Sequence, residues 1–279
     1  ISQAQKFLNF VIIGGGPTGV EVAGAIAEIA HKTMLQNFRR IDTTKTKVYL
    51  VEGSPSILPV YPQKLSNKAQ QYLEGLGVQV LTGKMVSDIT EEGVGIGDRF
   101  IESENVIWAA GNQASPLLKT LKVELDRQGR CKVEADLSVP GYPEVFVIGD
   151  ASHCKGKTDQ PVPSLAPAAV QMGRYVARII KKETPLEKRR PFYYVDKGTM
   201  ATIGKAKAIG MFGHIRFSGY PAWLAWCFVH IMYLIGFRNR FLVVLEWTFS
   251  YMSNHRGSRL IHSSIEKLLS KSNQEKPPK

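Results

Sequence analysis

The chain has 279 residues, a length that suits one large domain or two of ordinary size. Hydrophobic residues make up 44% and charged residues 22%, a balance that excludes a disordered chain and a fibrous repeat. The net charge of +12 is uneven, because residues 1–170 carry 17 Lys and Arg against 18 Asp and Glu, whereas residues 171–279 carry 19 against 6.

Buried strands and helices alternate over the first 110 residues. Short apolar runs predict strands at 10–13, 48–51, 78–81 and 106–108. The helical spacing of apolar residues predicts one helix from Pro17 to about Phe38 and another over 63–75. Glycines break residues 84–100 into short pieces, which is typical of an antiparallel meander. The order of these elements is that of a βαβ nucleotide-binding unit.

A glycine-rich turn joins the first predicted strand to the first predicted helix. Gly14 allows a tight turn, Gly16 lets a pyrophosphate approach the backbone, and Gly19 lets the helix pack closely on the strand. The N-terminus of the helix offers N–H groups and a partial positive charge to phosphates. Glu52 follows the second strand, where its carboxylate can accept both hydroxyls of an adenosine ribose. No arginine occurs in residues 53–56 to balance a 2′-phosphate, so NADH is predicted in preference to NADPH.

Another strand and helix follow before the composition changes. Residues 145–148 predict a buried strand closed by a Gly-Asp pair, and a helix is expected to begin within 163–169 and end near Lys182. The charged, Pro-flanked residues 181–191 are predicted to form a linker. Residues 195–217 are punctuated by glycine and predict a small sheet.

The C-terminal part is both apolar and cationic. Residues 220–237 are 18 residues without a formal charge, two arginines then interrupt the run, and residues 241–252 resume an apolar pattern. A bilayer span needs about 20 residues, so we expect a pair of interfacial amphipathic helices. A single membrane span and two helices buried in a soluble core are the alternatives. Positive charge beside a Trp-rich run favours anionic lipid as the partner, and nucleic acid is not expected.

The cysteines predict a reducing compartment, and the start of the chain indicates a longer parent protein. Cys131, Cys154 and Cys227 have no metal-ligand or redox spacing, so buried thiols in a reducing compartment and no metal are expected. The chain starts at Ile1 and enters an apolar run by Phe10, which is expected of an interior section of a longer protein. Residues 270–279 are polar and contain two prolines, so a disordered tail is expected there.

Four segments together resemble the second half of a flavoprotein with two dinucleotide-binding domains. In such enzymes an NADH-binding βαβ domain is inserted into an FAD-binding domain. The segments are 10–24, 107–116, 145–153 and 161–180. The resemblance implies an α/β fold in which residues 7–110 form a Rossmann-type NADH-binding domain and residues 111–182 form the C-terminal part of the FAD-binding domain.

The C-terminal third is similar to type II NADH dehydrogenases, the non-pumping NADH:quinone oxidoreductases. The similarity lies in residues 161–177 and in residues 223–261, which include the motifs at 236–240 and 255–259. It implies that residues 191–269 form a membrane-docking helical region. It also implies FAD and NADH as cofactors and a quinone, ubiquinone or menaquinone, as substrate.

The resemblance assigns roles to particular residues. Hydride would pass from NADH to FAD, and two electrons would pass on to the quinone without proton pumping. Glu21 would help to orient the nicotinamide, Asp150 would hold the ribityl chain, and Gln171 would border the quinone pocket. The cofactor-binding positions are Gly14, Gly16, Gly19, Glu52, Gly111, Gly149, Asp150 and Ala169. Many members carry a glutamine four residues before Gln171, where this chain has Pro167, so the hydrogen bonding of the quinone stays open.

The same resemblance implies a respiratory-chain enzyme on the cytoplasmic face of the bacterial inner membrane, docked peripherally. Two other functions remain open at this point: a soluble flavoprotein reductase with a protein electron acceptor, and a membrane-bound NADH-binding protein without flavin. The first FAD motif is missing from these residues, so whether this chain alone holds FAD is also open. The sequence does not decide whether the protein forms a homodimer.

Overall fold

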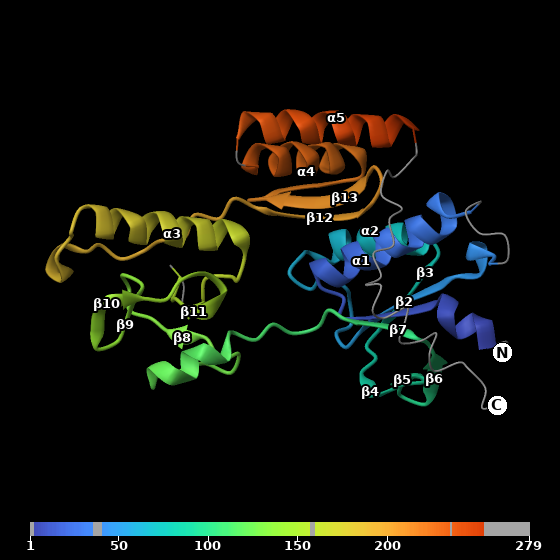
Figure 1. Ribbon diagram of the computed structural model, residues 1–279, viewed down its shortest axis with the longest axis horizontal. Helices are drawn as coiled ribbons and strands as arrows, with labels where there is room; N and C mark the ends of the chain where they lie inside the picture. The colour runs from blue at the N-terminus through green and yellow to red at the C-terminus, as the bar shows by residue number, and fades with distance from the viewer. Residues whose placement is uncertain (1–2, 36–40, 157–159, 235, 254–279) are drawn as a thin grey trace, which may run out of the picture.

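A computed structural model describes residues 3–35, 41–156, 160–234 and 236–253 of the chain. The helices are α1 (Pro17–Glu28), α2 (Gln63–Glu74), α3 (Ala166–Lys181), α4 (Tyr220–Tyr233) and α5 (Phe237–Ser253). Two lobes lie side by side, and extended chain at residues 109–115 joins them (Figure 1). One lobe contains α1 and α2 and the other contains α3, while α4 and α5 form a layer above the first lobe (Figure 1).

The lobe that contains α1 and α2 is built on a four-stranded parallel sheet. Its strands are β1 (Asn9–Ile13), β2 (Lys47–Glu52), β3 (Val78–Thr82) and β7 (Asn105–Trp108), in the order β3-β2-β1-β7. An antiparallel meander covers one face and consists of β4 (Val86–Thr90), β5 (Gly93–Ile96) and β6 (Arg99–Glu102). Alternate residues of β1 divide between the faces: Val11 and Ile13 pack toward the meander, and Ile12 packs toward the helices. The predicted nucleotide-binding order is therefore confirmed.

Two predictions about this lobe need correction. The first helix does not continue unchanged toward Phe38, because α1 ends at Glu28 and gives way to a π-helical turn at Ile29–Thr33. Phe38 lies outside the described residues. The last strand is not fully buried, because β7 pairs only with β1 among the described strands, and 63% of Trp108 is exposed at this sheet edge.

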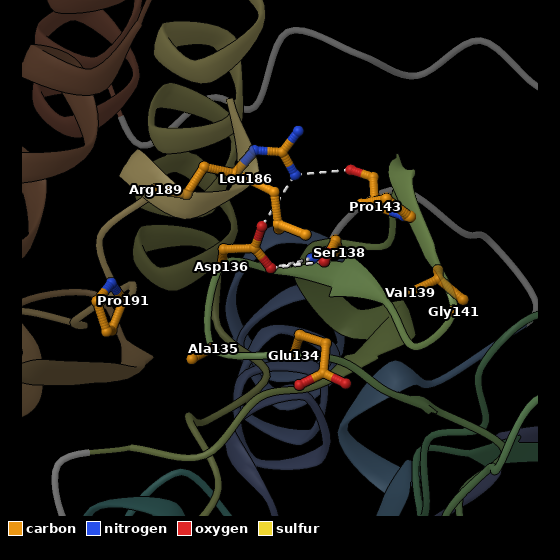
Figure 2. Close-up of a pocket in the computed structure, with 10 residues that line it drawn as sticks. All are labelled: Glu134, Ala135, Asp136, Ser138, Val139, Gly141, Pro143, Leu186, Arg189 and Pro191. Carbon is orange, nitrogen blue, oxygen red and sulfur yellow. Dashed lines mark hydrogen bonds and ion pairs between the residues drawn. The ribbon is translucent and has the colours of Figure 1, made fainter. Parts of the chain in front are cut away.

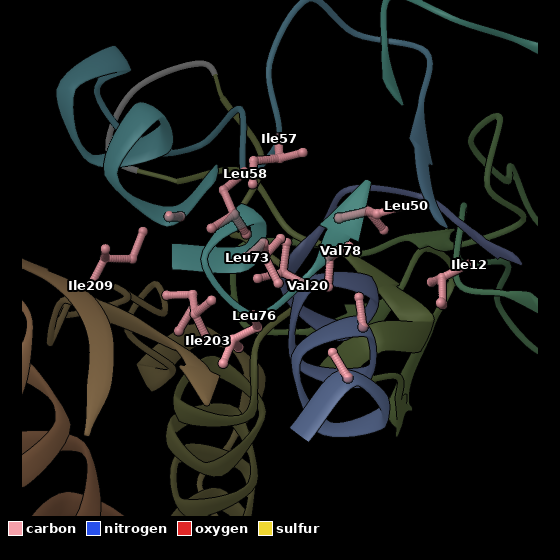
Figure 3. Close-up of a cluster of buried hydrophobic side chains, with 14 of the residues drawn as sticks. Ile12, Val20, Leu50, Ile57, Leu58, Leu73, Leu76, Val78, Ile203 and Ile209 are labelled. Carbon is pink, nitrogen blue, oxygen red and sulfur yellow. The ribbon is translucent and has the colours of Figure 1, made fainter. Parts of the chain in front are cut away.

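A three-stranded antiparallel sheet packs on the outer side of α1. It consists of β12 (Thr199–Gly204), β13 (Lys207–Phe212) and β14 (Ile215–Ser218), which confirms the small sheet predicted from the glycines. Ile203 and Ile209 of this sheet are fully buried and belong to the same hydrophobic cluster as Val20, Leu50 and Leu73 of the first lobe (Figure 3). The C-terminal sheet and the nucleotide-binding unit therefore share one core, although they are separated in sequence by about a hundred residues.

The apolar run at residues 220–237 does not form one continuous helix. α4 ends at Tyr233, and α5 begins at Phe237 and contains the second apolar pattern. The predicted pair of helices is thus present, with α4 lying on β13 and α5 lying on α4. Among the described residues, no helix combines the length and apolar character that a bilayer crossing requires.

The second lobe contains only short strands beside α3. These are β8 (Cys131–Lys132), β9 (Ser138–Val139), β10 (Tyr142–Phe146) and β11 (Ser152–His153). The buried strand predicted at 145–148 is confirmed only in part: β10 ends at Phe146, and Val147 is buried, but Val145 and Ile148 are each 36% exposed. Within the described residues β10 pairs with β9 alone, so no second neighbouring strand covers its other edge. A short apolar run becomes a buried strand only where neighbours cover it.

Residues 181–191 are not a free linker, which corrects that prediction. The guanidinium of Arg189 donates hydrogen bonds to Asp136 Oδ2 (3.0 Å) and to the carbonyl oxygen of Pro143 (2.6 Å). The next apolar residue, Phe192, is buried, and its amide donates to the carbonyl oxygen of Ala135. The segment after α3 is therefore fastened along the second lobe before it crosses to β12.

Short 3-10 helices join several of these elements, and the described cysteines are free thiols. The 3-10 helices are Gln3–Leu8, Thr43–Lys45, Pro116–Leu121, Gly149–Ala151 and Leu186–Lys188. Cys131 and Cys154 are buried as free thiols, as expected, whereas the free thiol Cys227 is only half-buried. The polar tail predicted at 270–279 lies outside the described residues.

Gly24 is predicted to be required for the contact between α1 and β12. A Cβ atom added at Gly24 would lie 2.5 Å from the carbonyl oxygen of Ile203, so Gly24→Ala should destabilise the protein by about 1–3 kcal/mol. Alanine normally stabilises a helix interior by about 1 kcal/mol relative to glycine. The matched control is Gly173→Ala in α3, where the nearest atom would be 3.9 Å away. Thermal unfolding should show a lower Tm for Gly24→Ala and no decrease for Gly173→Ala; equal Tm values for Gly24→Ala and wild type would contradict the contact.

Candidate functional site

Gly14 and Gly16 of the turn after β1, and Gly19 of α1, differ in what a side chain would meet at each position. Gly14 has a φ of +110°, and a Cβ there would lie 2.8 Å from the backbone of Ala109. A Cβ at Gly19 would lie 1.8 Å from the carbonyl oxygen of Gly14. At Gly16, by contrast, an added Cβ meets no atom of the described chain within 4 Å, and φ is −71°. The fold requires glycine at Gly14 and Gly19 but leaves open space at Gly16.

Open space at Gly16 fits a phosphate group placed against the backbone. Gly16 is the N-cap of α1, and no side chain of the described residues caps this helix end. An uncapped N-terminus directs N–H groups and the positive end of the helix dipole outward. β7 leads directly into the chain that crosses to the other lobe, so the carboxyl ends of the parallel strands face that lobe (Figure 1). Ligands of open α/β sheets bind outside these strand ends.

Glu52 lies beside this turn and is held by backbone amides. Its Oε2 accepts a hydrogen bond from the amide of Gly15 (2.6 Å), and its Oε1 accepts one from the amide of Ser54 (2.7 Å). Burial raises the pKa of the carboxyl, but these hydrogen bonds outweigh burial and bring the pKa of Glu52 below its ordinary value. Glu52 is therefore an anion at neutral pH, and each oxygen keeps lone pairs that can accept ribose hydroxyls.

A third loop, residues 83–85 after β3, also borders this site, and the sequence did not predict it. The amide of Gly83 donates to the carbonyl oxygen of Ser54 (2.8 Å), and the amide of Lys84 donates to the carbonyl oxygen of Glu52 (3.1 Å). The next residue is Met85, whose side chain is 74% exposed. The signal was available: neighbouring parallel strands end at one edge, so residues after β3 must lie beside those after β2. Sequence analysis treated residues 84–100 only as a meander.

Glu21 faces the C-terminal sheet. Its Oε1 accepts hydrogen bonds from the amide (3.3 Å) and the hydroxyl (3.5 Å) of Thr202 on β12. The carboxyl lines a cavity of about 270 Å³ together with Trp223 and Trp226 of α4 and Trp247 of α5. Burial raises the pKa of Glu21 above its ordinary value, although the hydrogen bonds from Thr202 oppose this. Glu21 thus bonds the C-terminal sheet and lines a cavity shared with the terminal helices.

Gln171 fastens α3 to the segment that precedes β12. Its Nε2 donates to the carbonyl oxygen of Val195 (2.9 Å), and its Oε1 accepts from the amide of Val195 (3.0 Å). Both ends of the side-chain amide are therefore engaged with one backbone residue. A quinone that hydrogen-bonds Gln171 would have to compete with this pair.

The Gly-Asp pair in the second lobe lies against the start of α3. Gly149 has a φ of +66°, and a Cβ built on it would lie 3.3 Å from the Cβ of Ala169. The amide of Gly149 donates to Met172 Sδ (3.2 Å), which holds the turn on the helix. The side chain of Asp150 is exposed beside this turn. The structure therefore brings Gly149, Asp150 and Ala169 together, an arrangement that can present a carboxylate to a polyol.

Gly111 and the cavity beside the Asp136–Arg189 ion pair lie apart from these groups. Gly111 has a φ of +72° in the extended chain between the lobes, and a Cβ there would meet nothing within 4 Å. A cavity of about 430 Å³ lies where Asp136 and Arg189 form their ion pair (Figure 2). None of the residues that line it is a predicted site residue. Asp136 and Arg189 pair with each other, Asp136 accepts from Ser138, and Arg189 donates to the carbonyl oxygen of Pro143, so these groups fasten the segment after α3.

Comparison with known proteins gives two family matches. Residues 1–173 match the family described as pyridine nucleotide-disulphide oxidoreductase, and residues 197–254 match the family described as NDH2 C-terminal domain. The first match covers more than half of the chain. The second covers the whole C-terminal sheet and both terminal helices.

Curated relatives and a solved structure agree with these matches. The type II NADH:quinone oxidoreductase Ndh of Mycobacterium tuberculosis is 44% identical over 269 residues, which cover 92% of this chain and 57% of the relative. NdhA of the same organism is 40% identical over 279 residues, covering 95% of this chain and 58% of the relative. The structure of NDH2 from Plasmodium falciparum in complex with NADH superposes with a TM-score of 0.80 at 19% identity, covering 88% of this chain and 66% of that chain. At this identity the structural likeness shows the fold alone.

The open space at Gly16 predicts a separation between ligand binding and stability. Gly16→Ala should leave the Tm unchanged and weaken NADH binding about tenfold, because the methyl group would occupy the approach of the pyrophosphate. Gly19→Ala is the matched control and should lower the Tm, because its Cβ would overlap the Gly14 carbonyl. Thermal unfolding and an NADH titration by fluorescence measure the two effects. Undiminished NADH affinity in a stable Gly16→Ala protein would remove the assigned role.

Proposed function

Because the chain belongs to the pyridine nucleotide-disulphide oxidoreductase family, in its type II NADH dehydrogenase branch, we propose that it acts as a flavin-dependent NADH:quinone oxidoreductase. The chain spans 57% and 58% of the two M. tuberculosis relatives, so the activity is proposed for the full-length protein. The observation that carries the proposal is the open approach to the backbone at Gly16, beside an ionised Glu52.

The residues of the first lobe would bind and orient NADH. The turn at Gly14, Gly16 and Gly19 receives the pyrophosphate at the N-terminus of α1, and Glu52 accepts the adenosine ribose hydroxyls. An ionised carboxylate in this place repels a 2′-phosphate, which favours NADH over NADPH. Glu21, on the first turns of α1, helps to orient the nicotinamide end and lies between it and the terminal helices.

The second lobe contributes the groups that suit FAD. Asp150 is exposed beside Gly149 and Ala169, where its carboxylate can accept hydroxyls of the ribityl chain, and Gly111 gives backbone access between the lobes. A flavin bound there would supply the two-electron chemistry between NADH and quinone. Gln171 borders the quinone side, and its amide would exchange its bonds to Val195 for bonds to the substrate.

The terminal helices suit docking on the surface of a membrane. On α4 the exposed apolar side chains include Leu224 and Phe228, and on α5 they include Phe241, Leu245 and Phe249, spaced at four-residue intervals along one stripe. The basic side chains of Arg238 and Arg240, in the first turn of α5, would attract anionic headgroups. This location, the cytoplasmic face of a bacterial inner membrane, gives a lipid-soluble quinone a route to the flavin that avoids water.

Spectroscopy of the full-length protein tests the proposed function. Purified protein should show flavin absorbance that bleaches when NADH is added and returns when a quinone is added. A colourless protein that still binds NADH would favour a membrane-bound NADH-binding protein without flavin. A flavin that bleaches with NADH but is reoxidised only by a small iron–sulfur protein would favour a soluble reductase with a protein acceptor.

Membrane docking predicts unequal loss of two activities. The double variant Phe241→Glu, Phe249→Glu should reduce binding to anionic vesicles about tenfold or more, because it removes two exposed aromatic anchors and adds two negative charges. Turnover with a lipid-soluble quinone should fall further than turnover with a soluble dye. Phe100→Glu on β6, also exposed, is the matched control and should change neither. Vesicle binding equal to wild type in the double variant would refute docking through α5.

A further inference from the structure

Met85 lies directly on the backbone of the residue that follows Glu52. A Cβ atom built on Gly53 would be 2.6 Å from Met85 Sδ, so the thioether rests where a side chain at Gly53 would stand. Two backbone hydrogen bonds hold this loop in place, from Gly83 to Ser54 and from Lys84 to Glu52. These bonds come from the two residues that precede Met85 and hold its backbone beside Gly53, although the side chain itself is 74% exposed.

Packing within the fold does not account for an apolar side chain here. Met85 belongs to none of the hydrophobic clusters formed by the described residues. Val86, the next residue, packs against the cluster beneath the meander, so the chain turns inward immediately after Met85. Gly53 in turn leaves the space that the thioether occupies. The result is an exposed apolar surface, made of a thioether beside a glycine backbone, at the carboxyl edge of the sheet.

This surface lies where the base of a bound dinucleotide has to go. Glu52 is the carboxylate that would hold the ribose hydroxyls, and the purine is attached to the same sugar, on the carbon next to the one that bears the 2′-hydroxyl. The purine ring must therefore lie no further from Glu52 than the width of the ribose. Because the pyrophosphate lies at Gly16, the purine lies on the side of the ribose away from α1. The loops after β2 and β3 are the ones that border this position, because their strands are neighbours and end together at Glu52 and Thr82.

We propose that Met85, laid across Gly53, is the platform on which the adenine ring of the dinucleotide packs. The inference rests on the proposed use of NADH and adds a recognition residue for the purine half. A polarisable thioether makes favourable contacts with aromatic rings, and its three rotatable bonds let it adapt to a flat ligand. Gly53 acts with it, because any side chain there would displace the sulfur. Recognition of the purine then comes from shape and dispersion, and recognition of the sugar comes from Glu52.

A truncated substrate tests this assignment in the full-length protein. Met85→Ala should raise the Kd and KM for NADH about three- to tenfold and leave kcat nearly unchanged. Reduced nicotinamide mononucleotide lacks the adenosine half, so its kcat/KM should be the same in Met85→Ala and wild type. Met85→Leu should restore most of the NADH affinity, because it restores the apolar surface. Ile89→Ala, at an exposed position of β4 toward the opposite end of the sheet, is the control and should change neither substrate.

The outcomes separate this inference from the proposed function. If wild-type protein fails to bind NADH, the proposed function and the platform both fall. If wild type binds NADH and Met85→Ala binds it equally well, only the platform is overturned. An equal loss of kcat/KM for NADH and for the mononucleotide would also overturn it, since the side chain would then affect the whole site. The Tm of Met85→Ala should stay within about 1 °C of wild type, because exposed substitutions have small effects on stability.

Discussion

The packing of the first lobe depends on two close backbone contacts of α1, one on each side of the helix, and both require glycine. On the inner side, Gly19 meets the carbonyl of Gly14, and this contact sets the height of the helix above β1. On the outer side, Gly24 meets the carbonyl of Ile203, and this contact sets the position of β12. A side chain at either place would push the elements apart. One short helix is therefore held between two sheets. The same contacts fix the direction of its N-terminus.

The two ends of the proposed reaction meet across this helix. The first turns of α1 carry the approach for the pyrophosphate and, a few residues on, Glu21. Through Thr202 and the cavity lined by Trp223 and Trp226, Glu21 contacts the sheet and the helices suited to a membrane surface. A helix advances only about 1.5 Å per residue, so the proposed nucleotide site and the helices proposed to dock on lipid lie close together. Gln171 adds a second connection, from α3 to the segment that leads into β12.

Local patterns predicted most of the first lobe correctly. A strand ended by Gly14, a helix opened by Pro17 and a second strand ended by Glu52 are each specified by residues within a few positions of one another, and all three are present. The family and its C-terminal domain were also recognised from short motifs. The failures occurred where burial depends on neighbours distant in sequence. The run at 145–148 is as apolar as a buried strand, but β10 has only β9 beside it in the described structure. The charged run at 181–191 looked unattached because Asp136, which pairs with Arg189, lies far from it in the sequence.

The sequence by itself determined the turn, the acid at the end of β2 and the helical periods, because these follow from backbone sterics and from the burial pattern along a single element. Only the tertiary structure decided which distant residues contact the turn, the acid and the helices. Strand order brought Met85 to Gly53 and gave Glu52 its amide partners. The fold of the chain back onto α1 gave Glu21 its contact with Thr202 and united the C-terminal sheet with the first core. Such contacts join residues tens to nearly two hundred positions apart, and no periodicity along the chain encodes them; they are fixed only when the sheets pack and exclude water together.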